Sequence, residues 1–151
     1  MQVIPYEPQY RQDFITAWIL DNFGFLEPED HEMFDHIEEA LAQGAMIYFA
    51  VEDGVALATC MTKPMTEGTW EICKLGSNKN RPHKGCGSAV FEAAMQWAIL
   101  HGAKRLFLLS NSRLTTALHL YKQYGFQEVP LDCCEYVRGD IAFEKILTDA
   151  T

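Results

Sequence analysis

Apolar positions near the start of the chain follow a spacing of three to four residues. This spacing occurs in residues 8–20 and again in an acidic segment that follows Pro28 and ends near Gly44. Because side chains three and four positions apart share one face of a helix, both segments are predicted to be amphipathic helices. A short strand over residues 3–6 is predicted to precede them.

Strand patterns occupy the middle of the chain. The apolar runs 46–51 and 55–61 flank Glu52-Asp53-Gly54, and an Asp-Gly turn between two such runs predicts a β-hairpin. A third strand, from Thr69 to about Ser77, is predicted after the turn at residues 66–68. These three strands form an antiparallel meander.

The second half of the chain returns to helices that alternate with strands. A strong helix is predicted from Gly85 to His101, a buried central strand over the apolar run 106–109, and a helix over 114–124. The last strands are predicted over 126–129 and 135–146. This order predicts a single α/β (α+β) domain over residues 1–151, with a mixed, mostly antiparallel twisted sheet flanked by helices.

Composition and charge exclude several classes of protein. The chain has 151 residues, 48% of them hydrophobic, and a formal net charge of −9, which argues against nucleic acid as the main partner. It has no apolar stretch of about 18 residues and no basic, apolar leader, so a cytoplasmic protein without a membrane contact is expected. Its five cysteines include no Cys-x-x-Cys pair, and no spacing suggests a metal site.

The positive charges gather at one place in this acidic chain. Up to residue 62 the only Lys or Arg is Arg11, whereas Lys74, Lys79, Arg81 and Lys84 lie close together in sequence. A cluster of this kind around a glycine-containing loop predicts an anion site. The acidic first half suits a cationic substrate, although acidic helix faces are more often simply solvated.

The loop itself leads from a strand into a helix that opens with Gly85 and Gly87. The first turn of a helix has unpaired N–H groups and a positive dipole, and glycines let a phosphate approach them closely. The alternative is that the glycines only permit a tight turn. A dinucleotide motif fails because Val90 stands at its third glycine, and a nucleoside triphosphate motif fails because Lys84 precedes the glycine.

Three segments resemble the GNAT superfamily of N-acetyltransferases. Residues 71–76 resemble its fourth strand. Residues 84–87 (Lys-Gly-Cys-Gly) resemble the end of its acetyl-CoA signature Gln/Arg-x-x-Gly-x-Gly/Ala, with Pro82 at the Gln/Arg position. Residues 117–126 resemble its Ala-x-x-Leu-Tyr-x-x-x-Gly-Phe motif, and Leu114 stands where the family often has Asn. The resemblance implies the GNAT acyl-CoA N-acyltransferase fold.

The resemblance also implies residue roles. Main-chain groups of Leu75 and Ser77 would pair with the pantetheine arm, Asn111 would contact it, and Tyr121 would protonate the leaving thiolate. The pyrophosphate would be bound by His83 together with the backbone N–H groups of Lys84, Gly85, Cys86, Gly87 and Ser88. Cys86 is otherwise interpreted as a small packing residue.

Two side chains are candidates for proton transfer. Tyr121 suits the acid because a phenol is protonated at neutral pH, and its alternative role is packing in a helix. Glu71, flanked by Trp70 and Ile72, is the candidate base, because apolar neighbours raise a carboxyl pKa. Its alternative is an ion pair with Lys74 or another cation, and water can relay the amine proton instead.

The predicted function is direct transfer of the acetyl group of acetyl-CoA to a primary amine of a small molecule or peptide. The acceptor is expected between residues 22–31 and 130–138, and a homodimer is compatible with the resemblance. The competing prediction is a non-catalytic module that binds CoA or a protein partner, and a third is transfer of a longer acyl group.

Overall fold

The computed structural model describes residues 1–15, 35–78, 81, 83–130 and 141–147. The first half contains β1 (Gln2–Pro5), the 3-10 helix η1 (Pro8–Tyr10), α1 (Arg11–Ile15), α3 (Ile37–Ala42), β2 (Met46–Glu52), β3 (Val55–Pro64) and β4 (Thr69–Ser77). The second half contains α4 (Cys86–Leu100), β5 (Arg105–Ser110), α5 (Thr115–Gln123), β6 (Gln127–Val129) and β7 (Ile141–Ile146). Within these ranges the predicted element order is confirmed; the predictions for residues 16–34 and 131–140 lie outside them.

The strands form one sheet in the order β1-β2-β3-β4-β5-β7-β6. The β4–β5 pair is parallel, and the other five neighbouring pairs are antiparallel. The predicted mixed, mostly antiparallel sheet is therefore confirmed. The β2–β3 hairpin turns at Asp53 and Gly54, with φ of 52° and 77°, the left-handed conformation that an Asp-Gly turn favours.

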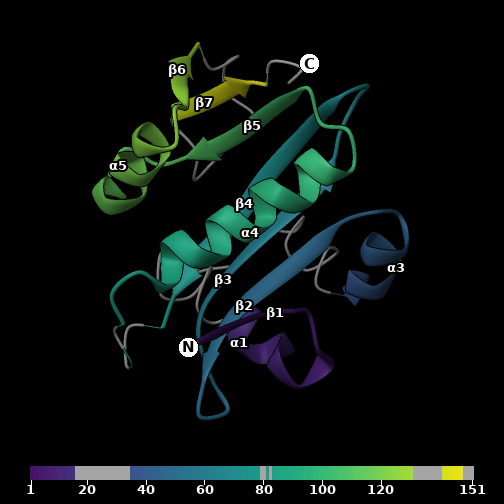
Figure 1. Ribbon diagram of the computed structural model, residues 1–151, viewed down its shortest axis with the longest axis vertical. Helices are drawn as coiled ribbons and strands as arrows, with labels where there is room; N and C mark the ends of the chain where they lie inside the picture. Colours follow the sequence, from purple (N-terminus) through teal and green to yellow (C-terminus); the bar gives the residue numbers. More distant parts are fainter. Residues whose placement is uncertain (16–34, 79–80, 82, 131–140, 148–151) are drawn as a thin grey trace.

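The two faces of the sheet carry separate apolar cores. One core packs α4 and α5 against Trp70, Ile72, Leu106, Leu108 and Phe143. The other packs Tyr10, Phe14 and Ile37 against strand residues that include Phe49 and Met61. Figure 1 shows α4 crossing in front of the central strands, with α1 and α3 beside β1 and β2. No helix in the described residues is long and apolar enough to cross a membrane.

The prediction that residues 106–109 are buried throughout is wrong. In β5, Leu106 and Leu108 are buried, whereas Phe107 and Leu109 are only partly buried. Successive strand residues point to opposite faces, and only the face toward α4 is fully covered. An uninterrupted apolar run therefore did not mean burial on both sides.

The parallel pairing between β4 and β5 is short. It joins Thr69, Trp70 and Glu71 to Arg105, Leu106 and Phe107, and no later residues of the two strands pair. Figure 1 shows the strands starting together and separating toward α5 and the amino end of α4. We call the unpaired parts, residues 72–77 of β4 and 108–110 of β5, the β4–β5 split.

Candidate functional site

A β-bulge lies in β4 where the strand borders the split. The β3–β4 register shifts between Met61↔Cys73 and Thr59↔Gly76, so that Lys74 and Leu75 together oppose Cys60. Lys74 has φ of 57°, a left-handed conformation that is uncommon for a residue other than glycine. A bulge bends and twists its strand, and this one changes the direction of the β4 backbone beside the split.

The predicted backbone contacts of Leu75 and Ser77 lie just after this bulge. Leu75 is partly buried against the α4-side core, and Ser77 is exposed at the end of β4. On the β3 side Ser77 pairs with Ala58 whereas Leu75 lies in the bulge, and within the described ranges the edge toward β5 has no strand partner beyond Glu71. An unpaired edge of this kind can accept an extended ligand as an added strand.

The amino end of α4 presents amides that the protein does not cap. The N-cap is Gly85 with φ of 87°, and no side chain caps the helix. Within the described part of the chain, the amide of Ser88 meets no acceptor, that of Gly87 reaches only the Cys86 sulfur, and that of Cys86 has a long contact of 3.4 Å to the His83 carbonyl. These N–H groups and the helix dipole favour an anion at this end.

The space over the two glycines is open. A Cβ atom at Gly85 or at Gly87 would meet nothing within 4 Å. A neighbouring group therefore does not force glycine at these positions, whereas the alternative of a tight turn stays open. The φ of Gly85 does require a residue that tolerates the left-handed region.

Both ends of the loop before α4 are attached to β3. The Asn78 amide donates to the Leu57 carbonyl at 2.8 Å, and its side-chain nitrogen donates to the Ala56 carbonyl at 3.2 Å. At the other end, the Cys86 thiol contacts the same Leu57 carbonyl at 3.8 Å. Cys86 is buried, and burial raises the pKa of its thiol, which supports a packing role for this residue.

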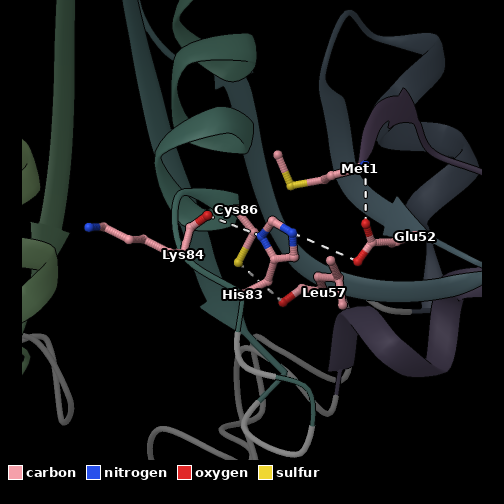
Figure 2. Close-up of polar contacts among 6 residues, drawn as sticks. All are labelled: Met1, Glu52, Leu57, His83, Lys84 and Cys86. Atoms are coloured by element: carbon pink, nitrogen blue, oxygen red, sulfur yellow. Dashed lines mark hydrogen bonds and ion pairs between the residues drawn. The ribbon is translucent and has the colours of Figure 1, made fainter.

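His83 links this loop to the β2–β3 hairpin. Its Nε2 lies 3.7 Å from a Glu52 carboxylate oxygen and its Nδ1 lies 3.0 Å from the Lys84 carbonyl. Figure 2 shows the ring between these two acceptors, while the Lys84 side chain extends away from Glu52. His83 and Lys84 thus lie beside the open amides, with the Lys84 side chain exposed.

Tyr121 lies on α5, at the opposite side of the split. It is 5% exposed, and its ring packs against Phe91, Phe126 and Phe143 at centroid distances of 5.5, 6.4 and 5.6 Å. Burial raises the pKa of Tyr121; the nearby Ser110 hydroxyl lowers it in part, although Ser110 Oγ forms no hydrogen bond within the described residues. The thiols of Cys60 and Cys73 also raise the Tyr121 pKa.

Glu71 points away from its apolar neighbours. Trp70 and Ile72 are buried in the α4-side core, and alternation along the strand directs Glu71 to the other face. There its carboxylate lies 3.4 Å from Lys63 Nζ on β3. Trp70 and Ile72 therefore do not form the apolar environment expected for the Glu71 carboxylate, and the alternative ion pair is present with Lys63 as the cation.

Asn111 follows the end of β5 and is 9% exposed. Its side-chain oxygen accepts hydrogen bonds from the Arg113 amide at 2.9 Å and from Arg113 Nε at 3.1 Å. The Asn111 side chain therefore orders the turn between β5 and α5. The expected acceptor segments, residues 22–31 and 130–138, lie outside the described residues apart from Pro130.

Sequence reasoning missed two partners at this site. Lys63 and Glu71 lie at equal sequence distance on either side of Glu67 in the β3–β4 turn, and the two residues are paired across the hairpin. The register of the hairpin could therefore have predicted this ion pair. Tyr124, whose hydroxyl lies 3.0 Å from Ser88 Oγ, had no such signal because 36 residues separate the pair. No group of three or more candidate metal ligands occurs within the described residues.

Comparison with known proteins gives one family and many similar folds. Residues 10–126 match the model of the Acetyltransferase (GNAT) family. The chain is 27% identical over 124 residues to the Bacillus subtilis (strain 168) protein named "Uncharacterized N-acetyltransferase YobR", a match that covers 80% of this chain. It spans about half the length (49%) of that curated relative.

Solved structures share the fold at low sequence identity. An acetyltransferase of the GNAT family from Staphylococcus aureus Mu50 has a TM-score of 0.83 at 14% identity, over 97% of this chain and 99% of the other. The PaiA N-acetyltransferase from Thermoplasma acidophilum, solved in complex with coenzyme A, has a TM-score of 0.71 at 14% identity, over 97% and 100%. At these identities the likeness shows the fold alone.

Proposed function

Because the chain belongs to the acetyltransferase (GNAT) family, we propose that it moves the acetyl group of acetyl-CoA directly to a primary amine of a small molecule or peptide. The observation that carries the proposal is the uncapped first turn of α4, open over Gly85 and Gly87 and placed beside the β4–β5 split. The similar fold of the PaiA protein, which was solved with coenzyme A, supports the choice of ligand.

The diphosphate would bind at the amino end of α4. The amides of Cys86, Gly87 and Ser88, with those of Lys84 and Gly85, supply donors, and the exposed Lys84 and Arg81 add positive charge. His83 adds a third cation when it is protonated. Pro82, at the family's Gln/Arg position, removes one amide donor, and Arg81 precedes it directly.

The pantetheine arm would lie along the split. The edge of β4 after the bulge lacks a strand partner, so main-chain groups of Leu75 and Ser77 are available to it. Asn111 lies at the end of the opposite strand, where it orders the β5–α5 turn. This path leads the acetyl thioester toward the bulge and Tyr121.

In the transfer itself, an N–C bond forms as the C–S bond breaks, and the thiolate takes a proton. The Tyr121 hydroxyl is the proposed donor. Because burial raises the pKa of Tyr121, the phenol keeps its proton at neutral pH and acts first by hydrogen bonding to the developing thiolate.

The amine must lose a proton before or during attack. Glu71 is the proposed base, and its carboxylate is held on β4 by the ion pair with Lys63. Water remains the alternative route for this proton. The acceptor would approach from the Glu71 face of the sheet, opposite the α4 core.

The test replaces Tyr121 by Phe in the full chain. Phe keeps the ring among Phe91, Phe126 and Phe143 and removes only the proton donor. We expect kcat to fall about 100-fold, as for loss of a general acid, with the calorimetric affinity for CoA unchanged. Turnover is measured against an amine library, which also identifies the acceptor class.

Tyr10→Phe is the matched control, since Tyr10 is also buried but packs against Phe49 in the other core. Parental turnover by Tyr121→Phe would remove its assigned role. Failure of the parent to bind CoA would overturn the proposed function. If the parent binds CoA but acetylates no amine, the non-catalytic module is the better account.

A further inference from the structure

A chain of three side chains leads away from the first turn of α4. Ser88 Oγ lies 3.0 Å from the Tyr124 hydroxyl, which in turn lies 3.4 Å from Glu92 Oε2. Ser88 belongs to the first turn of α4, Glu92 lies one turn further, and Tyr124 is the C-cap of α5. The chain therefore connects the helix that presents the open amides to the helix that carries Tyr121.

The protons in this chain have one consistent direction. A carboxylate only accepts hydrogen bonds, so Tyr124 donates its single proton to Glu92. Either hydroxyl of the Ser88–Tyr124 pair can be the donor, but while the Tyr124 proton is held by Glu92, the phenol oxygen accepts and Ser88 donates to it. In this arrangement the Ser88 proton is directed to Tyr124 and is not offered to an anion at the helix end.

We propose that Tyr124 and Glu92 are positioning residues that set how readily the Ser88 hydroxyl donates to the diphosphate of an acyl-CoA. The inference rests on the proposed function, because it requires that diphosphate at the amino end of α4. When the diphosphate binds, the Ser88 proton turns to a phosphate oxygen. The Tyr124 proton then turns to Ser88 Oγ, and Glu92 loses its donor.

Glu92 opposes binding in two ways. It competes for the hydrogen-bond chain, and its negative charge remains within two turns of the helix end that receives the anion. Because the product CoA carries the same diphosphate as the substrate, this opposition also speeds product release. Tyr124 and Glu92 thus weaken the binding of both the acyl-CoA substrate and the CoA product, which favours turnover.

The experiment titrates CoA calorimetrically into the full chain and its variants. Tyr124→Phe retains the ring against Phe91, at a centroid distance of 5.3 Å in the parent. It frees Ser88, and we expect CoA to bind about two- to fivefold more tightly. Glu92→Gln removes the charge, and we expect about three- to tenfold tighter binding that diminishes at high salt. Glu67→Gln, an exposed carboxylate in the β3–β4 turn, is the matched control.

A double-mutant cycle isolates the hydrogen-bond chain. In a Ser88→Ala background, Tyr124→Phe is expected to change CoA affinity by less than about 1.5-fold, because the hydroxyl that Tyr124 positions is absent. In kinetics, the single variants are expected to lower KM for acetyl-CoA and also to lower kcat, because CoA that is bound more tightly is released more slowly. The parent and its variants are expected to bind inorganic pyrophosphate in the same order of affinity as CoA. Turnover of S-acetylpantetheine, which lacks the diphosphate, is expected to be the same in the parent and the variants.

Unchanged or weaker CoA binding by Tyr124→Phe would overturn the inference, as would an equal effect in the Ser88→Ala background. An equal change in S-acetylpantetheine turnover would also overturn it, because it would indicate a general rearrangement. A parent chain that binds no CoA would instead overturn the proposed function. The two failures are thereby distinguished by the parent titration alone.

Discussion

The two ends of the β4–β5 pair contrast in how their backbone groups are satisfied. At the closed end, the Gly68 carbonyl accepts hydrogen bonds from the Lys104 and Arg105 amides at 2.7 and 3.0 Å, and Arg105 Nε binds Glu144 at 2.8 Å. At the open end, the strands no longer pair, and Gly87 and Ser88 present amides without a backbone acceptor among the described residues. One end is stabilised by its own contacts, and the other presents unpaired groups to a ligand.

This difference separates stability from function along a single pair of strands. The first-turn N–H groups of a helix have no partner within the helix, so such a set beside an unpaired strand edge is available to a ligand. The contacts at the closed end hold β4 and β5 in a fixed orientation, and in that orientation the two strands are separated at the open end. Substitutions at the two ends are therefore expected to have different consequences.

The largest expected effect comes from breaking the closed end. Leu106 pairs with Trp70 in the short parallel ladder and is fully buried. Leu106→Ala removes buried methyl groups and leaves a cavity, so we expect a loss of about 2–5 kcal/mol in the free energy of unfolding. Urea denaturation measures it. Leu100→Ala, where the parent side chain is 79% exposed, is the control, with less than about 0.5 kcal/mol expected. Equal losses would contradict the contrast.

A smaller effect is expected from filling the open end at Gly85. Gly85 and Gly54 both have positive φ and open space where the methyl group of an alanine would lie, so Ala at either costs about 1–2 kcal/mol of backbone strain. Only Gly85→Ala places a methyl group where the diphosphate would bind, and we expect its KM for acetyl-CoA to rise about tenfold. Gly54→Ala, in the β2–β3 turn, is the matched control. Parental KM in Gly85→Ala would show that no phosphate approaches this glycine.

The smallest effect concerns the buried phenol that faces the open end. Burial raises the pKa of Tyr121 in the folded state above the value of about 10 of an unfolded chain. Its contribution to stability is therefore present below pH 10 and is lost as pH rises, because the unfolded state ionises first. Between pH 10 and 11 we expect the parent to lose about 1 kcal/mol more than Tyr121→Phe in urea denaturation.

Below pH 9, Tyr121 is protonated in both the folded and the unfolded parent protein. Stability measured in this range is therefore the internal control for the alkaline comparison. There the stability difference between parent and Tyr121→Phe is expected to be independent of pH. An identical alkaline loss in both proteins would mean that Tyr121 is not desolvated in the folded chain.

Local patterns in the sequence predicted most of the described fold. The Asp53-Gly54 hairpin, the strand 69–77 and the helix after Gly85 all follow from turn chemistry and periodicity, which neighbouring residues determine. The glycine loop also predicted where uncapped amides would lie. The one-sided burial of β5 was not predicted, because an apolar run does not specify which face another element covers.

The partners of the site residues were harder to predict. The ion pair of Glu71 with Lys63 depends on hairpin register, and the Ser88–Tyr124 contact depends on how α4 and α5 pack. Both are consequences of tertiary structure. The roles of Tyr121 and of the loop amides came from a family resemblance, and they remain predictions for experiment.

The short β4–β5 ladder joins two halves of the sheet, because β4 is paired with β3 as far as Ser77 and β5 is paired with β7. Beyond Glu71 the strand continues through Ser77, a length of about 20 Å at about 3.3 Å per residue. A rotation of about 5° between the two halves at the three paired residues would move the far end of β4 by roughly 1.7 Å relative to β5, more than the tolerance of a hydrogen bond. Substitutions near Gly68 or Lys104, remote from every proposed ligand contact, are thus positioned to adjust the fit of the ligand.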